Sequence, residues 1–190
     1  MLVLVTGLVI FLGVHSISIF APAWRDSMAA RLGVEPWKRI YSLASIVGFA
    51  LLVWGYGLAR QEPVILYQPP VWLRHLTALL MLPVFPLLFA TYLPGRIQSA
   101  VKHPTLTATK AWAVAHLLAN GALADLLLFG GFLAWAVLDR ISVGKRAPRP
   151  VPGAPASKLN DAIAIVGGLA VYAVFVGWAH AWLFKVAPLP

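Results

Sequence analysis

Residues 2–21 read LVLVTGLVIFLGVHSISIFA, an apolar run without a single Lys, Arg, Asp or Glu. A helix needs about 20 such residues to cross the hydrocarbon core of a bilayer, which is about 30 Å thick. The run has no basic segment before it and no small-residue cleavage site after it. It therefore predicts a retained transmembrane helix and not a cleaved signal peptide.

Further long apolar stretches extend this interpretation to the whole chain. Its 190 residues are 61% hydrophobic and 11% charged, whereas a soluble domain has about 25% charged residues. We expect an all-α, polytopic transmembrane helix bundle with about five spanning helices in a single domain over residues 1–190. The predicted spans are about 2–21, 40–58, 71–93, 110–138 and 162–186, and a mobile, basic, Pro-rich loop covers 139–160.

Two of these spans are expected to depart from a straight, perpendicular helix. The third contains Pro83 and Pro86, each of which removes a backbone donor, so this helix should be kinked. The fourth, over 110–138, is longer than a perpendicular crossing needs, so it should tilt or protrude from the bilayer.

Charge and cysteine content exclude several classes of function. The formal net charge is +9, which fits basic loops that face anionic headgroups. No basic module is long enough to fold alone, so we expect no nucleic-acid partner. The chain has no cysteine, which excludes disulfides, iron–sulfur clusters and thiolate-bound haem. The Lys and Arg residues divide evenly between the two predicted faces, so the sequence does not decide the membrane orientation.

The histidines are the candidate functional residues, because ionisable groups at membrane depth are costly. His15, His116 and His180 lie six or seven residues from an end of their predicted spans, roughly 10 Å below the surface. Alternation of five spans places these three, with the loop residue His103, in one leaflet and His75 in the other. Neutral imidazoles at matched depth suit axial ligation of haem b. The competing interpretation is that each histidine forms a hydrogen bond to a neighbouring helix.

Two other features bear on this site. Ala113 and Ala119 share a helix face with His116 by their three-residue spacing, and small side chains leave room for a flat macrocycle. Asp125 lies nine residues beyond His116, which places it on the opposite side of a continuous helix. For Asp125 the sequence favours a hydrogen bond or ion pair within the bundle over proton transfer, but it does not establish the role.

Several motifs resemble the NnrU family of bacterial integral membrane proteins. They are His15-Ser16, APAWRD at 21–26, WKRIYSL at 37–43, VWGYGLARQEP at 53–63, RHLTALLMLP at 74–83, HPTLTATKAWAVAHLLANG at 103–121 and DLLLFGGFLAWAVLDR at 125–140. The resemblance covers nearly the whole chain, and the stretch 103–121 is its most specific part. It implies a multi-pass protein of the bacterial inner membrane that is associated with nitrogen oxide metabolism and denitrification.

The same superfamily includes the 15-cis-ζ-carotene isomerase, a haem b membrane enzyme with histidine axial ligands. Its motifs match His15-Ser16, His103-Pro104 and Ala115-His116 here, so the resemblance implies that His15 and His116 are the haem iron ligands. His103 and His180 are secondary candidates for cofactor binding. The isomerase has a cysteine three residues before the second ligand, where this chain has Ala113. The resemblance therefore implies haem binding for this chain, but it does not imply isomerase activity.

The preferred hypothesis is an NnrU-like membrane protein that supports nitrogen oxide metabolism and binds haem b through intramembrane histidines. One alternative is a haem-dependent cis-trans isomerase of a carotenoid or isoprenoid. Another is a cofactor-free assembly or transport partner of membrane oxidoreductases. The expected partners are the lipid bilayer and either a lipophilic substrate or a membrane oxidoreductase. The sequence names no catalytic residue, no substrate and no oligomeric state, and it leaves open whether the protein is an enzyme.

Overall fold

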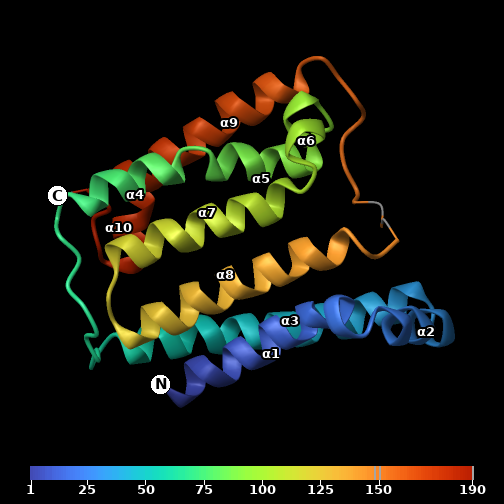
Figure 1. The fold of residues 1–190 in the computed structure, drawn as a ribbon, viewed down its shortest axis with the longest axis horizontal. Helices are drawn as coiled ribbons and strands as arrows, with labels where there is room; N and C mark the ends of the chain where they lie inside the picture. Colours follow the sequence, from blue (N-terminus) through green and yellow to red (C-terminus); the bar gives the residue numbers. More distant parts are fainter. Residues whose placement is uncertain (148, 150, 190) are drawn as a thin grey trace. The chain divides into compact units, whose positions relative to one another are not determined.

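The computed structural model describes residues 1–147, 149 and 151–189, and these residues are mostly helical (Figure 1). Five of the described helical segments are long and apolar enough to cross a membrane: Leu2–Phe20, Val34–Ala59, Leu73–Tyr92, Leu123–Val143 and Asn160–Phe184. The same residues contain no strand, and their isolated β-bridge joins Ile65 to Ala122. The predicted all-α bundle with several spanning helices is confirmed.

The chain forms two compact units, and each is built from two separate stretches of sequence. Unit 1 comprises Met1–Tyr67 and Ala122–Ala147, and unit 2 comprises Gln68–Gly121 and Pro148–Pro190. Each unit is therefore interrupted in the sequence by a part of the other.

Unit 1 contains two long helices from the start of the chain and one from its second stretch. Its elements are α1 (Leu2–Phe20), α2 (Pro22–Leu32), α3 (Val34–Ala59) and α8 (Leu123–Val143). Helix α1 packs along α3 and also contacts α8 (Figure 1). The short helix α2 connects α1 to α3 through a single residue at each end.

Glycines allow α1 and α3 to approach closely. A Cβ at Gly7 would overlap the backbone of Leu52, and a Cβ at Gly55 would overlap the backbone of Leu4. Small residues at helix contacts are the usual means of close packing in a membrane, where no hydrophobic effect drives helices together.

Unit 2 is built around three helical rods. Its elements are α4 (Leu73–Met81), α5 (Val84–Tyr92), α6 (Arg96–Val101), α7 (Pro104–Ala119), α9 (Asn160–Val174), a π-helical turn (Phe175–Ala179) and α10 (His180–Phe184). Side-chain hydrogen bonds show which ends of these helices lie side by side. Thr77 Oγ1 near the start of α4 donates to Ala115 O near the end of α7 (2.8 Å). Tyr172 Oη, late in α9, donates to Ala78 O (2.9 Å), so α7 and α9 both run antiparallel to the α4–α5 rod.

The break between α4 and α5 confirms the kink predicted from the prolines. Helix α4 ends at Met81, and α5 begins at Val84 directly after Pro83. Proline cannot donate a backbone hydrogen bond to the preceding turn, so the helical pattern is interrupted there.

The predicted continuous helix over 110–138 is wrong. Helix α7 ends at Ala119 and α8 begins at Leu123, because Asn120 and Ala122 have extended backbone with ψ of 133° and 157°. The interruption is stabilised by the connecting segment after α3, since Val64 O accepts a hydrogen bond from Leu123 N (2.8 Å).

The boundary of the predicted 139–160 loop is also corrected, because α8 continues to Val143. Pro148 and Pro150 of that loop lie outside the described residues. Later in the loop, Ala154 N donates to Tyr92 O (2.8 Å). The mobility of the loop stays a prediction.

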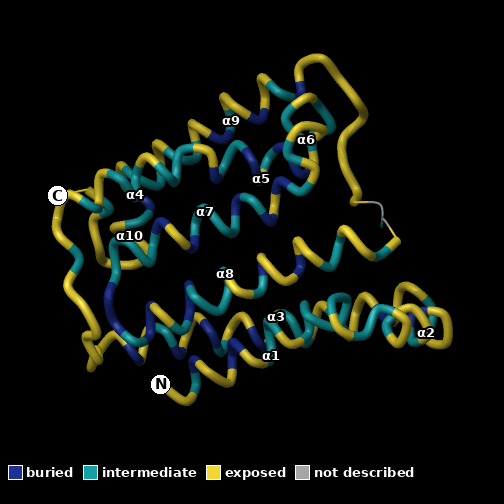
Figure 2. Tube along the Cα trace, viewed as in Figure 1, coloured by how far each residue is buried: buried dark blue, intermediate teal, exposed yellow. Residues whose placement is uncertain are grey.

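Burial within each unit follows the helix contacts. Figure 2 shows buried residues where helices of a unit face each other and exposed residues on the outward sides. Many outward residues are large and apolar, such as Val9 (66% exposed), Leu43 (64%) and Val166 (69%). Exposed apolar surface of this extent suits a protein whose solvent is lipid.

Candidate functional site

His15 lies in an aromatic cluster of unit 1. Its ring centroid is 4.3 Å from that of Phe11, 5.3 Å from Tyr41 and 6.1 Å from Trp135, so α1, α3 and α8 all contribute. His15 Nδ1 is 2.7 Å from the carbonyl oxygen of Phe11. A carbonyl can only accept, so Nδ1 carries the proton in this geometry and the lone pair is on Nε2.

His116 has the same local arrangement in unit 2. Its Nδ1 is 2.8 Å from the carbonyl oxygen of Trp112, four residues earlier in α7. The Trp112 ring lies beside the imidazole, with centroids 5.3 Å apart. The carbonyl of His116 itself accepts from Asn120 Nδ2 (2.8 Å), which ends the helix one turn later.

The two predicted ligands therefore share one hydrogen-bonding arrangement. In each, the backbone carbonyl of an aromatic residue four positions earlier accepts from Nδ1 and so fixes the ring and its tautomer. The nitrogen that remains free to ligate a metal is Nε2. A carbonyl bonded to the other ring nitrogen is the usual support of a metal-binding histidine. His15 lies in unit 1 and His116 in unit 2, so their joint ligation of one iron stays a prediction.

The predicted distribution of histidines between leaflets is wrong for unit 2. His103 caps the start of α7, whereas His116 lies in its last turn, so these two are at opposite ends of one helix. His75, in the first turn of α4, lies at the same end of unit 2 as His116, because Thr77 bonds to Ala115. The error follows from the incorrect fourth span, in which His116 was placed near the beginning of a helix and not near its end.

The secondary candidate His180 has a different environment from the two predicted ligands. Its Nδ1 is 2.7 Å from the carbonyl oxygen of Val186, in the segment after α10. The π-helical turn Phe175–Ala179 precedes it directly. Within the described part of the chain, no three His, Asp or Glu side chains form a group that could hold a metal ion.

Asp125 forms the predicted hydrogen bond within the bundle. Tyr56 Oη donates to its Oδ1 (2.6 Å), and Ala122 N donates to its Oδ2 (2.9 Å). The carboxylate thereby joins α3 to the first turn of α8. A negative charge at this end of a helix is also stabilised by the helix dipole. Burial raises the pKa of Tyr67, and the nearby charge of Asp125 raises it further. The expected placement of Asp125 and His116 on one helix is wrong, since they belong to α8 and α7.

A second buried carboxylate, which the sequence did not single out, lies at the other end of α8. Asp139 is 8% exposed, and its Oδ1 is 2.9 Å from Arg146 Nη2. This contact is an ion pair between two largely buried side chains. Arg146 Nη1 also donates to Ser18 O at the end of α1 (2.9 Å). Trp135, one turn before Asp139, has a buried Nε1 with no hydrogen-bond partner among the described residues.

A family model described as "NnrU protein" matches residues 3–188 of the chain. The chain belongs to the NnrU family. Comparisons with curated proteins and with solved structures yield no match.

The stretch that most specifically resembles the NnrU family is a complete structural element. Residues 103–121 contain α7 with both of its ends, from the capping residue His103 to the extended Asn120. Ala113, for which the resemblance to the isomerase implies a cysteine, is fully buried inside unit 2. The absence of a thiol at this position therefore concerns the interior of the unit and not its lipid-facing surface.

Proposed function

We propose that this NnrU-family protein of the bacterial inner membrane supports nitrogen oxide metabolism by binding haem b, with His15 and His116 as the iron ligands. The observation that carries the proposal is the shared fixation of the two imidazoles. Each Nδ1 lies within 2.7–2.8 Å of the backbone carbonyl four residues earlier. This contact selects the tautomer whose Nε2 is able to ligate iron.

The donor set of the chain fits haem b and few other cofactors. There is no cysteine, and the described residues offer no three-ligand group for a single metal ion. Haem b needs only two neutral imidazoles, and when bound it supplies one-electron redox chemistry. The aromatic rings of Phe11, Tyr41 and Trp135 lie beside His15, which is half-buried.

Absorption spectra of the detergent-purified protein test the proposal. We expect a Soret band and the reduced-minus-oxidised spectrum of a haem with two histidine ligands. His15→Ala and His116→Ala should each lower the haem content or shift the spectrum to that of a haem with one histidine ligand. His75→Ala is the matched control, because it removes an imidazole from another predicted spanning helix and should leave the spectrum unchanged.

Three results would contradict the assignment in different ways. A wild-type protein without a Soret band, after expression with added haem precursor, excludes the cofactor. A spectrum that is unaffected by both His15→Ala and His116→Ala excludes these ligands. A spectrum lost in His180→Ala or His103→Ala, with both primary variants intact, assigns the iron to the secondary candidates.

A further inference from the structure

Helix α2 is held at the membrane surface by its two connections. It contains 11 residues and is therefore about 16 Å long, which is too short to cross a bilayer. One residue, Ala21, joins it to the spanning helix α1, and one residue, Gly33, joins it to the spanning helix α3. Gly33 has φ of 85°, a conformation that favours glycine. With such short junctions, α2 lies in the headgroup layer, which is roughly 5–8 Å thick on each side.

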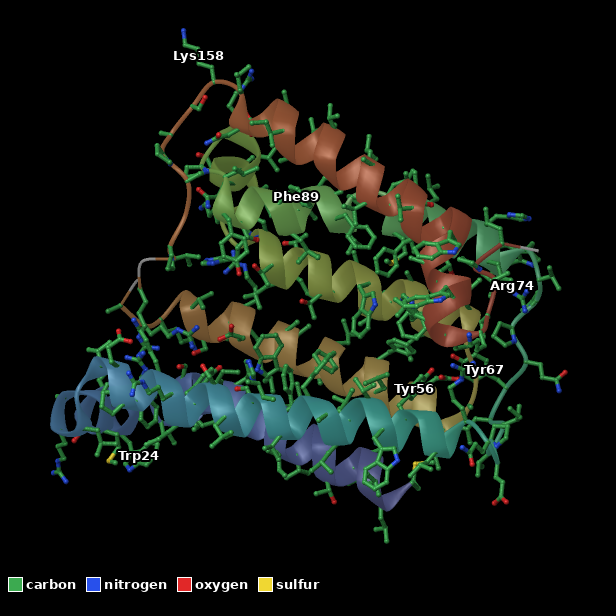
Figure 3. The ribbon with its side chains drawn as sticks, turned by 180° about the vertical axis from the view of Figure 1, so that it is seen from behind. Trp24, Tyr56, Tyr67, Arg74, Phe89 and Lys158 are labelled. Carbon is green, nitrogen blue, oxygen red and sulfur yellow. The ribbon has the colours of Figure 1, made fainter. Side chains whose placement is uncertain are left out.

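Two tryptophans fix α2 against the start of α3. The rings of Trp24 and Trp37 meet edge to face, with centroids 5.9 Å apart and an interplanar angle of 76°. Trp37 is 7% exposed, whereas Trp24 is 51% exposed. Figure 3 shows Trp24 at the end of unit 1 that α2 forms. Tryptophan favours the boundary between hydrocarbon and headgroups, so this pair agrees with the depth set by the connections.

Helix α2 and the first turns of α3 carry more positive than negative charge. We define the α2 patch as the charged residues of α2 and of the first turns of α3: Arg25, Asp26, Arg31, Glu35, Lys38 and Arg39. Two of its four cations form salt bridges. Arg25 Nη1 is 2.9 Å from Asp26 Oδ1, and Lys38 Nζ is 2.8 Å from Glu35 Oε1. Arg31 and Arg39 are exposed, and neither takes part in a salt bridge within the described residues. The patch therefore offers two guanidinium groups to an external anion.

We infer that the α2 patch binds the headgroups of acidic phospholipids, such as phosphatidylglycerol, in preference to zwitterionic ones. A guanidinium group binds a phosphate oxygen pair in a fork geometry. Arg31 and Arg39 belong to a surface at headgroup depth, next to exposed apolar residues such as Leu32 and Val34 that suit acyl chains. This inference is independent of haem, because the patch does not include the proposed ligands.

Lipid retention tests the inference on the full-length protein. The purified protein is equilibrated with an equimolar mixture of phosphatidylglycerol and phosphatidylcholine, and the lipids that remain after mild delipidation are counted by mass spectrometry. Each cation near an anionic surface favours binding about fivefold. We therefore expect the wild-type protein to retain phosphatidylglycerol in at least about fivefold excess. The double variant Arg31→Gln/Arg39→Gln should lose most of this excess.

Three further variants separate the patch from general charge and from misfolding. Arg74→Gln/Arg140→Gln removes two exposed arginines elsewhere and should keep the excess. Arg31→Lys/Arg39→Lys keeps the charge and should keep most of the excess. Asp26→Asn/Glu35→Gln removes the competing carboxylates and should increase the excess, which misfolding would not do. Equal retention by the wild type, or the same loss in Arg74→Gln/Arg140→Gln as in Arg31→Gln/Arg39→Gln, would overturn the inference.

Discussion

The buried polar side chains of unit 1 are charged, whereas those of unit 2 are neutral. Among the described residues, unit 1 buries Asp125 and Asp139, and unit 2 buries Thr91 and Asn160. The two carboxylates lie near opposite ends of α8, and each is bound by a side chain from another part of the unit. The buried polar side chains of unit 2 are neutral and bond to backbone carbonyls, as Asn160 does to Pro94 O (2.8 Å).

This difference determines how each unit should respond to substitution. A buried carboxylate that loses its cation remains as an uncompensated charge in a medium of low dielectric constant. The loss of a neutral side-chain hydrogen bond between membrane helices costs only about 0.6 kcal/mol on average. Unit 1 should therefore be the more sensitive of the two to the loss of a single polar partner.

The largest effect is expected for Arg146→Gln in unit 1. The substitution leaves Asp139 buried without its cation and should lower the free energy of unfolding by about 3 kcal/mol. Thermal or denaturant unfolding in detergent measures the change. The matched control is Lys145→Gln, which removes a neighbouring exposed charge and should have little effect. If both variants unfold alike, the Asp139–Arg146 pair does not stabilise unit 1.

An intermediate effect is expected where glycine packs against a helix backbone, and here the two units should behave alike. A Cβ at Gly55 or at Gly168 would overlap backbone of the helix packed against it, whereas Gly57 and Gly177 have open space. Gly55→Ala and Gly168→Ala should each cost about 2 kcal/mol, the usual magnitude for overpacking.

The controls Gly57→Ala and Gly177→Ala lie on the same helical segments as the tested glycines. Gly57→Ala should be neutral or slightly stabilising, because alanine favours a helix over glycine by up to about 1 kcal/mol. Equal unfolding midpoints for Gly55→Ala and Gly57→Ala would show that α1 and α3 separate easily enough to absorb a methyl group.

The smallest effect is expected for Thr77→Val in unit 2. The substitution removes the hydrogen bond from Thr77 Oγ1 to Ala115 O. Side-chain hydrogen bonds between membrane helices contribute about 0.6 kcal/mol on average, so the unfolding midpoint should shift only slightly. Thr109→Val is the control, because its hydroxyl bonds within its own helix to Thr105 O. If Thr77→Val lowers the free energy of unfolding as much as Arg146→Gln does, the two units do not differ in their sensitivity to the loss of a polar partner.

Local sequence signals predicted the spanning helices, but they missed the turn between α7 and α8 and ended α8 too early. The break before α5 was predictable because Pro83 lacks a backbone donor. The break between α7 and α8 was missed, although Asn120-Gly121 is a turn signal and Asp125 favours a helical first turn. Apolar residues on both sides of the turn made the stretch read as one long span.

The candidate site shows the same limit. Individual histidines were recognisable, because a polar group at membrane depth stands out in an apolar run. Their neighbours were not, since these depend on which helix ends meet, and one misplaced helix end put His116 near the wrong end of its span. The partner of Asp139 was hidden as well, because Arg146 lies beyond the end of α8 in a segment that read as loop.

The interleaving of the two units has a consequence for biogenesis. As the ribosome delivers the chain, α1 to α3 enter the bilayer first, but α8 of the same unit is synthesised only after α4 to α7. Unit 1 is therefore only partly assembled until α8 has been synthesised. Until then, lipid covers the surfaces of α1 and α3 that α8 later contacts. Unit 2 in turn waits for α9. A nascent chain released after residue 121 would lack α8 of unit 1 and α9 of unit 2, so both units would be incomplete.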